Sequence, residues 1–230
     1  AAAVDESLID SPQHRALARE AAAASAVLAH NSCGKARGSC ALPVKAAESI
    51  AVIGPFANCS DSIGGGWSKT NCYLHSYAGI PSKIVSVLDA VQEDGAALGA
   101  SVAFEEGSTD LAPISASSIA AAAAAARKAS VTILAVGTGG NVEKESLDRA
   151  SLGLPEAQQQ LLEAVHAAAK KLVVVVVSAG PVFIAPTLAD AILYAGYGGM
   201  EAGHGVTDII FGRVSPSGRF PVTVYGEDYL

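Results

Sequence analysis

The chain has 230 residues, and its 15 Lys and Arg against 22 Asp and Glu give a formal charge of −7 at pH 7. Half of the residues are hydrophobic and only 16% are charged, which excludes a disordered chain. An acidic chain with 5% aromatic residues and no basic stripe is a poor candidate for nucleic-acid binding. We also expect no membrane span, because the longest apolar runs, residues 119–126 and 172–177, fall far short of about 20 residues.

The first predicted helix begins at Ser11, an N-cap residue followed by proline in the first turn, and runs to about Leu28. Ser49–Ile53 is predicted to be a short buried strand. Residues 58–79 are rich in Gly, Ser and Cys, which predicts a long loop. A second helix is predicted to begin at Pro81, and residues 102–104 are predicted to lie in a strand.

The second half of the chain alternates apolar strand-length runs with amphipathic or Ala-rich helix-length segments. Such alternation is typical of a mostly parallel sheet with both faces covered by helices. Because no repeat or interdomain linker is visible, we expect one α/β domain over residues 1–230, a flavodoxin-like α/β sandwich. The predicted helices are 115–128, 155–171 and 200–211, and the predicted strands are 131–136, 172–177, 191–195 and 221–225.

Four cysteines form two close pairs, Cys33 with Cys40 and Cys59 with Cys72, and neither pair has zinc-ligand spacing. We expect each pair to close a short loop as a disulfide in an oxidising compartment, either extracellular or secretory and vacuolar. Four buried thiols are the alternative, and four cysteines allow three connectivities. An Asn-Cys-Ser sequence at Asn58 fits the N-glycosylation pattern.

Several common chemistries are absent from the pattern. The glycine-rich stretch that begins at Gly137 has Val142 where a dinucleotide fingerprint needs its third glycine, and no phosphate-binding P-loop occurs. There is no G-x-S-x-G elbow, and the five histidines are scattered without metal-ligand spacing. We therefore expect no cofactor and no metal site.

A charged loop follows the predicted strand 131–136. Ligands of parallel α/β sheets bind beyond the carboxyl ends of the strands, and this loop places Glu143, Glu145, Asp148 and Arg149 there. Two carboxylates two residues apart, flanked by further charges, could include one acid with an altered proton affinity. A solvated charged loop is the alternative, and composition alone favours it.

Five segments in sequence order change that balance; they are residues 14–31, 50–58, 77–81, 145–158 and 198–225. Together they resemble the C-terminal α/β sandwich domain of glycoside hydrolase family 3. The resemblance is greatest to the β-xylosidase/α-arabinofuranosidase branch and extends over nearly the whole chain.

Enzymes of this family are retaining glycosidases, with an Asp nucleophile on a TIM barrel and a Glu acid/base on the α/β domain. The resemblance implies that Glu145, three residues before the Asp148-Arg149 pair, is the acid/base, with Glu143 as its competitor. A Glu on such a loop can protonate a leaving oxygen once bound sugar excludes water. Asp148 and Arg149 are expected to form an ion pair that orients Glu145.

The resemblance therefore implies the acid/base-bearing domain of an exo-β-glycosidase that hydrolyses O-glycosyl bonds. β-Xylosidase-like activity in xylan degradation is favoured, and β-glucosidase activity is possible. The barrel is not among these 230 residues, so we expect a TIM-barrel partner, as a separate or cleaved chain, and no activity of this chain alone. A non-catalytic carbohydrate-binding or scaffold subunit is the alternative. His30, Ser82 and Ser130 differ from the residues usual in the family and are expected to lie around the sugar pocket.

Overall fold

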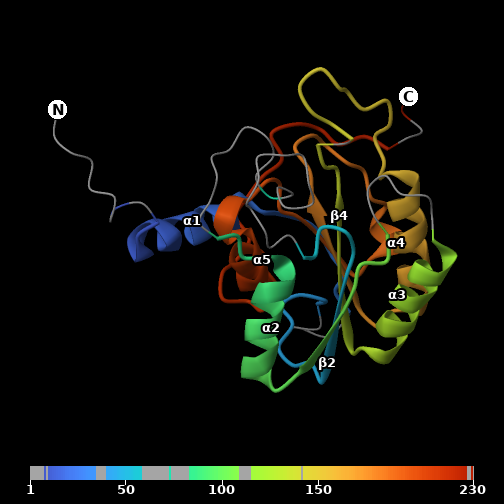
Figure 1. Cartoon of the computed structure of the whole chain (residues 1–230), viewed down its shortest axis with the longest axis horizontal. Helices are drawn as coiled ribbons and strands as arrows, with labels where there is room; N and C mark the ends of the chain where they lie inside the picture. Colours follow the sequence, from blue (N-terminus) through green and yellow to red (C-terminus); the bar gives the residue numbers. More distant parts are fainter. Residues whose placement is uncertain are drawn as a thin grey trace.

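The computed structural model describes residues 8, 10–34, 40–58, 73, 83–108, 115–140, 142–226 and 229. Within these ranges a single sheet is flanked by helices on both faces (Figure 1). The elements are α1 (Pro12–Ser25), β1 (Val27–Asn31), β2 (Ser49–Ile53), α2 (Val87–Leu98), β3 (Ser101–Glu105), α3 (Ala116–Lys128), β4 (Val131–Gly137), α4 (Glu156–Ala168), β5 (Leu172–Val177), η3 (Pro186–Leu188), β6 (Ala191–Tyr194), η4 (Gly199–Glu201) and α5 (Ala202–Ile210).

The sheet has six strands in the order β1-β6-β5-β4-β2-β3. All neighbouring pairs are parallel except β1, which runs antiparallel to β6 at one edge. The five parallel strands, taken in their spatial order from β3 to β6, reproduce the 2-1-3-4-5 order of flavodoxin-like sheets. This topology confirms the predicted fold class.

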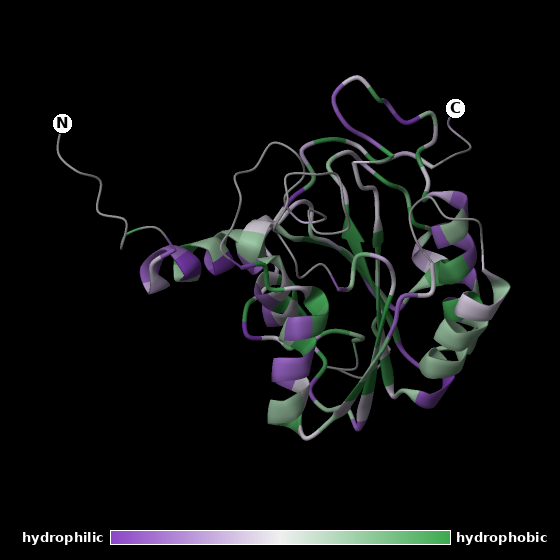
Figure 2. Cartoon of the chain, in the orientation of Figure 1, coloured by the Kyte–Doolittle hydropathy of each residue, from purple (hydrophilic) through white to green (hydrophobic). Residues whose placement is uncertain are grey.

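Alternate residues of the strands face two separate hydrophobic layers. Ile133 and Ala135 of β4 pack in the layer under α2 and α5, whereas Leu134 and Val136 pack in the layer under α3 and α4. Figure 1 shows α1, α2 and α5 on one side of the sheet and α3 and α4 on the other. Figure 2 shows hydrophobic residues concentrated on the strands between the two helix layers. Because both faces of the central strands are buried, β4 and β5 are almost continuous apolar runs.

The two ends of the fold differ from the prediction. The first helix ends at Ser25 rather than near Leu28, and Val27–Asn31 forms the antiparallel edge strand β1. Local pattern could not reveal this, because the helix-like spacing continues through Leu28 and the pairing partner of β1 lies more than 160 residues away. The predicted strand at residues 221–225 is also wrong, since the structure has no strand there. Instead Phe220 packs edge-on against Tyr194, with ring centroids 4.9 Å apart.

The second helix begins at Val87, later than predicted. Residues 83–86 are not helical, and Ser86 and Asp89 form a capping box in which each side chain bonds to the backbone of the other residue. Pro81, the predicted start, lies outside the described residues. A serine followed three residues later by an acid was therefore the correct helix signal.

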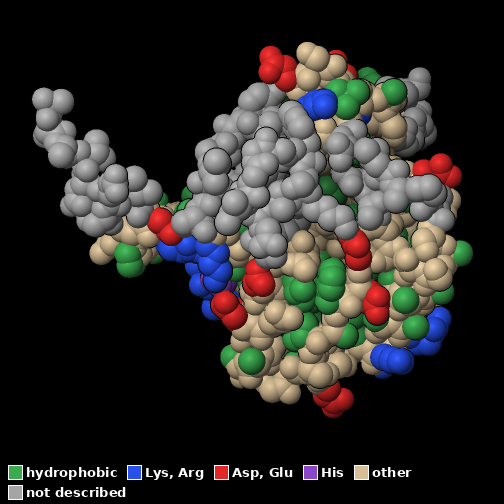
Figure 3. Space-filling model, viewed as in Figure 1, with side chains coloured by type: hydrophobic (Ala, Val, Ile, Leu, Met, Phe, Trp, Pro, Cys, Tyr) green, Lys and Arg blue, Asp and Glu red, His purple; other side chains and the backbone are tan. Residues whose placement is uncertain are grey.

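Ion pairs around the buried Asp208 connect the helices on the face formed by α1, α2 and α5. Asp208 of α5 is only 5% exposed and receives two hydrogen bonds of 2.6 Å from Arg19 of α1, and another from Arg213. Arg213 in turn binds both carboxylate oxygens of Asp94 on α2 at 2.8 Å. Burial alone would raise the pKa of Asp208, but the hydrogen bonds and charges of the two arginines lower it. Figure 3 shows basic and acidic side chains gathered beside α1 and α2.

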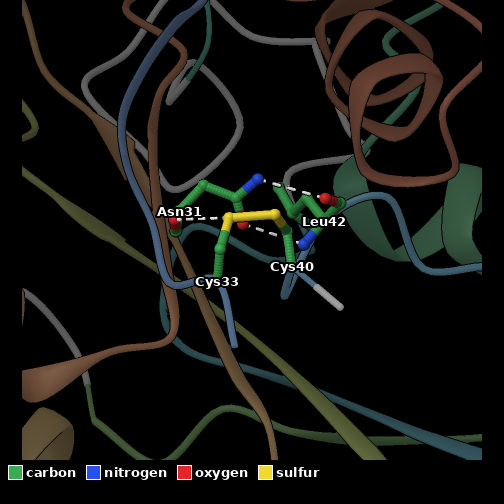
Figure 4. Close-up of a disulfide and its surroundings, with 4 residues drawn as sticks. All are labelled: Asn31, Cys33, Cys40 and Leu42. Carbon is green, nitrogen blue, oxygen red and sulfur yellow. Dashed lines mark hydrogen bonds between the residues drawn. A yellow bond between two sulfur atoms is a disulfide. The ribbon is translucent and has the colours of Figure 1, made fainter. Parts of the chain in front are cut away.

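The disulfide predicted between Cys33 and Cys40 is present, with an S–S distance of 1.98 Å (Figure 4). Beside it, the Asn31 side chain donates to the Leu42 carbonyl at 3.1 Å and accepts from the Leu42 amide at 2.9 Å. The side-chain amide of Asn31 thus satisfies both the N–H and the C=O of Leu42. The disulfide and the Asn31 side chain therefore hold the same short loop. The other predicted disulfide, Cys59 with Cys72, lies outside the described residues.

We expect the Cys33→Ser/Cys40→Ser double variant to lose about 2 kcal/mol of unfolding free energy, because the bond closes a loop with a sequence separation of 7. Urea unfolding at equilibrium measures this difference. The variant tests the bond more cleanly than a reducing agent, which would also act on Cys59 and Cys72. An unchanged unfolding midpoint would show that the loop is held without the disulfide.

Candidate active site

The candidate site lies at the carboxyl ends of β4, β5 and β6. The chain leaves β4 into a loop that rises above the sheet (drawn in yellow in Figure 1), and charged side chains lie on this end of the molecule in Figure 3. The loop stands over a cavity of about 620 Å³. The cavity is lined by Glu143, Lys144, Glu145, Leu147, Asp148, Arg149, Ser151, Leu152, Ala179, Pro181 and Tyr197.

The loop is built around a tight hairpin turn. Lys144 and Leu147 exchange two backbone hydrogen bonds, of 3.0 and 2.9 Å, which leaves Glu145 and Ser146 as the two central residues. Ser146 has a φ of 67°, so the third position of the turn is left-handed, as in a type II turn. This backbone places the exposed Glu145 side chain at the tip of the hairpin, on the wall of the cavity.

Glu143, one residue before the turn, is held by donors from several segments. One carboxylate oxygen accepts from the Thr138 hydroxyl at 2.6 Å and the Ala179 amide at 2.9 Å. The Tyr197 hydroxyl lies 3.4 Å from the same oxygen and donates to the Thr138 carbonyl at 2.7 Å. The other oxygen accepts from Arg149 Nε at 2.7 Å. Both side chains of this ion pair are mostly buried, with exposed fractions of 14% for Glu143 and 12% for Arg149.

These contacts determine the ionisation of Glu143. Burial alone would raise the pKa of its carboxyl group, but the hydrogen bonds from Thr138 and Ala179 and the charge of Arg149 outweigh that effect, so the pKa is lowered. Burial and the nearby Glu143 charge raise the pKa of Tyr197. At neutral pH the site therefore contains an ionised Glu143 and a protonated Tyr197.

Arg149 fastens the far end of the hairpin to the turn after β5. Its guanidinium donates to the Pro181 carbonyl at 2.9 Å and to the Ser151 carbonyl at 3.3 Å, besides its bond to Glu143. Gly180 makes this approach possible, because a Cβ atom there would lie 2.7 Å from Arg149 Nη2. The absence of a side chain at position 180 thus leaves the room that the Arg149 side chain occupies.

The start of the loop is fixed from the helix layer below. Gln158 of α4 is fully buried, and its amide accepts from the Gly137 backbone at 2.8 Å and donates to the Gly137 carbonyl at 2.9 Å. Gly137 is the last residue of β4, where strand pairing ends. A single side chain therefore satisfies both backbone groups at the point where the chain leaves the sheet.

The structure brings Glu143, Glu145, Asp148 and Arg149 together on one cavity wall. The expected Asp148–Arg149 ion pair is not formed: in the described part of the loop, Arg149 pairs with Glu143, and Asp148 is exposed. Glu143 and Arg149 instead face each other across the base of the hairpin, with Arg149 Nε 2.7 Å from the Glu143 carboxylate.

Residues predicted elsewhere have mixed outcomes. Ser130 does not line the cavity. It precedes β4 at the amino ends of the strands, opposite to the candidate site, and its hydroxyl donates to the Ser49 carbonyl at 2.7 Å. His30 lies within β1, opposite Ile192, and does not line the cavity. Asn58 is exposed, and its glycosylation stays a prediction. Ser82 lies outside the described residues.

Sequence reasoning missed the side chains of Thr138, Gln158 and Tyr197, which hold the loop, and the space that Gly180 leaves for Arg149. Each follows the end of a buried strand or starts the next helix, which is the usual place for site residues in a parallel sheet. That position was the available signal, because these residues carry no motif of their own.

The described part of the chain contains neither a helix that could span a membrane nor a cluster of metal ligands. No helix there has the length and apolar character needed to cross a membrane. Nor do three or more His, Cys, Asp or Glu side chains in those ranges come together as a metal site would require.

Comparison with known sequences reveals close relatives. The profile of the glycosyl hydrolase family 3 C-terminal domain matches residues 17–229. A β-xylosidase/α-L-arabinofuranosidase 1 of Medicago sativa subsp. varia is 37% identical, over 95% of this chain and 26% of that protein. A periplasmic β-glucosidase of Salmonella typhimurium is 30% identical, over 93% of this chain and 29% of that protein.

Solved structures agree. A family 3 exo-β-xylosidase in complex with a xylobiose aziridine activity-based probe superposes with a TM-score of 0.78 at 27% identity, over 96% of this chain and 28% of that one. A family 3 β-glucosidase of Bifidobacterium adolescentis gives a TM-score of 0.76 at 35% identity, over 93% of this chain and 29% of that one.

The fold, the charged hairpin over its cavity and these similarities define the chain as a domain of a glycoside hydrolase. It spans about a quarter of the length of the relatives that it matches. The chain belongs to glycosyl hydrolase family 3, as the C-terminal domain of such an enzyme.

Proposed function

We propose that this chain provides the general acid/base, Glu145, of a retaining exo-β-glycosidase. In such a mechanism a protonated carboxyl group donates its proton to the departing glycosidic oxygen, and the resulting carboxylate later activates a water molecule. A carboxyl group with this task must reach the substrate and exchange protons with it. Glu145 meets the first requirement, because it is exposed at the tip of the hairpin and lines the cavity of about 620 Å³.

The observation that carries this proposal is the contrast between Glu145 and Glu143. Glu143 accepts hydrogen bonds from Thr138, Ala179 and Arg149, and its pKa is lowered, so it is occupied and ionised. A group held in this state is a poor general acid. Of the two glutamates of the loop, Glu145 is therefore the one left to act, and it also occupies the position that matches the family motif.

The nucleophile is proposed to come from a TIM-barrel domain, as a separate or cleaved chain or as another part of the same protein. A retaining mechanism needs its two carboxyl groups about 5–5.5 Å apart, so the barrel must dock at the carboxyl edge of the sheet. Apolar side chains left exposed near that edge support such docking; they are Leu147 at 38%, Phe220 at 38%, Val222 at 53% and Tyr225 at 44%.

For the substrate, we propose the non-reducing end of a β-linked xylo-oligosaccharide, with a β-glucoside as the second candidate. The names of the relatives support both sugars, since β-xylosidases and β-glucosidases are each among the similar proteins. We further propose a secretory or extracellular location, with N-glycosylation at Asn58. The Cys33–Cys40 disulfide supports an oxidising compartment, and one relative is named as periplasmic.

Assay of xylobiose and cellobiose with the complete protein, barrel included, and with this chain alone tests the proposal. We expect hydrolysis only when the barrel is present, faster with xylobiose, and a β-anomer as the first product in NMR spectra. If the complete protein binds xylo-oligosaccharides but hydrolyses neither disaccharide, the chain is instead part of a non-catalytic carbohydrate-binding protein.

A further inference from the structure

We propose that Glu143 is a positioning residue: its carboxylate fastens the hairpin that carries Glu145 to the carboxyl ends of the central strands. This inference rests on the proposed role of Glu145 as the acid/base. It assigns a task to the second carboxylate of the loop, which the sequence pattern presents only as a competitor of Glu145.

The donors to Glu143 come from segments that are far apart in the chain. Thr138 follows β4 and Ala179 follows β5, and both donate to the same carboxylate oxygen; Tyr197 follows β6, donates to the Thr138 carbonyl at 2.7 Å, and has its hydroxyl 3.4 Å from that oxygen. One side chain therefore connects the ends of three neighbouring strands. Since those strands form the buried centre of the sheet, they provide a rigid base for the loop.

The hairpin needs such a base, because its own backbone provides little. In the described part of the loop, its ladder consists of the pair of backbone hydrogen bonds between Lys144 and Leu147, and an isolated two-stranded hairpin is marginally stable. Glu143 immediately precedes this ladder and Arg149 follows it two residues later. The 2.7 Å contact between Glu143 and Arg149 thus closes the base of the hairpin.

Arg149 then attaches this base to the turn after β5 through the Pro181 carbonyl, at 2.9 Å. The ion pair is mostly excluded from solvent, so water screens it less than a surface pair. With both ends of the hairpin tied to the sheet, the position of Glu145 relative to the cavity is set by Glu143. A misplacement of about 1 Å can reduce a rate about 10²-fold.

Amide hydrogen exchange of the 230-residue chain tests the anchoring independently of activity. We expect Glu143→Gln to increase the exchange rates of the Lys144–Leu147 turn amides at least tenfold. Glutamine keeps only one acceptor oxygen, so it cannot accept from Ala179 and from Arg149 at the same time, and its NH2 group would face one of these donors. Glu163→Gln, on the exposed face of α4, is the matched control and should leave these rates unchanged. Unchanged turn exchange in Glu143→Gln would overturn the proposal.

Kinetics of the complete enzyme, barrel included, test the positioning. We expect Glu143→Gln to lower kcat for a disaccharide about 10–100-fold with little change in KM. The limb of the pH profile of kcat that reflects loss of the proton from the general acid should remain. Added azide should not restore the rate, because Glu145 is still present. Wild-type kcat would overturn the proposal, and azide rescue would identify Glu143 itself as the acid/base.

A second pair of variants covers the case in which Glu143→Gln fails to fold. Thr138→Val removes the hydroxyl that donates to Glu143 and should lower kcat several-fold. Thr138→Ser keeps this hydroxyl donor, and its kcat should stay at the wild-type value. Equal kcat in the two variants would count against positioning. If Glu145→Gln keeps full activity, the proposed function fails, whereas the exchange experiment still reports on the anchoring alone.

Discussion

Replacement of Glu145 by glutamine is expected to slow disaccharide hydrolysis by the complete enzyme about 10²–10⁴-fold, the usual contribution of general acid–base catalysis. The departing sugar oxygen is basic and needs a proton when the glycosidic bond breaks. Glutamine has nearly the same shape as glutamate but cannot donate this proton. The rate of xylobiose hydrolysis, measured at saturating substrate, gives the effect directly.

Two further measurements on Glu145→Gln distinguish loss of an acid/base from other defects: one changes the leaving group of the substrate, and the other adds a nucleophile that replaces water. A dinitrophenyl glycoside has a leaving group that hardly needs protonation, so formation of the glycosyl-enzyme should be slowed far less. Azide should then accelerate its breakdown, because it replaces the water that Glu145 would have activated. Glu163→Gln should behave as the wild type. Equal slowing of both substrates, or wild-type xylobiose hydrolysis in Glu145→Gln, would contradict the assignment.

Replacement of Asp208 by asparagine is expected to cost about 2 kcal/mol of unfolding free energy. Loss of one partner of a buried ion pair costs about 3–5 kcal/mol, but the side chains of Arg19 and Arg213 are 37% and 40% exposed, and water can compensate part of the loss. The helices α1 and α5 would lose their bidentate connection. Equilibrium urea unfolding at pH 7 measures the difference.

The pH dependence follows from the lowered pKa of Asp208. In the unfolded chain an aspartate has a pKa of about 3.9. In the folded protein the Asp208 carboxylate therefore stays ionised at lower pH than it does in the unfolded chain. The stabilisation is therefore complete above that value and is lost as the pH falls through the lowered pKa of the folded state. The difference between wild type and Asp208→Asn should stay constant from about pH 5 to pH 8 and shrink below about pH 4.

The control for this effect is Asp94→Asn, which removes the more exposed partner of the same Arg213 side chain. We expect a loss below about 1 kcal/mol, as is usual for exposed pairs. If Asp94→Asn is as destabilising as Asp208→Asn, burial of Asp208 is not the source of the stabilisation. A difference that grows in acid would contradict the sign of the pKa shift.

Much of the sheet could be predicted because burial on both faces is visible in the sequence. The strand Leu172–Val177 has the predicted bounds, and β4 extends one residue beyond its prediction, since continuous apolar runs of that length indicate central parallel strands. Edge elements are different. The strand β1 depends on pairing with β6, and residues 221–225 have a strand-like composition but no strand to pair with in the structure. Composition alone does not distinguish a segment that finds a neighbouring strand, such as β1, from one that does not, such as residues 221–225.

The site was predictable in location but not in its connections. A cluster of acids after a buried strand indicated the loop, because the carboxyl ends of parallel strands are where ligands bind. The partners of Arg149 could not be predicted, since Glu143 and Asp148 are both close to it in sequence, whereas the Pro181 carbonyl comes close only through the fold. The groups that Arg149 binds, Glu143 and the Pro181 carbonyl, are set by how the hairpin folds back over the turn after β5.

The anchoring of Glu143 relies partly on backbone groups, and this has an evolutionary consequence. The amide of Ala179 donates to Glu143 whatever side chain that position carries, and the Pro181 carbonyl accepts from Arg149 in the same way. Mutations at position 179 could therefore accumulate without loosening the hairpin. If the proposed function holds, substitutions in the cavity lining, which includes Ala179, can alter the preferred sugar without changing the geometry that holds Glu145.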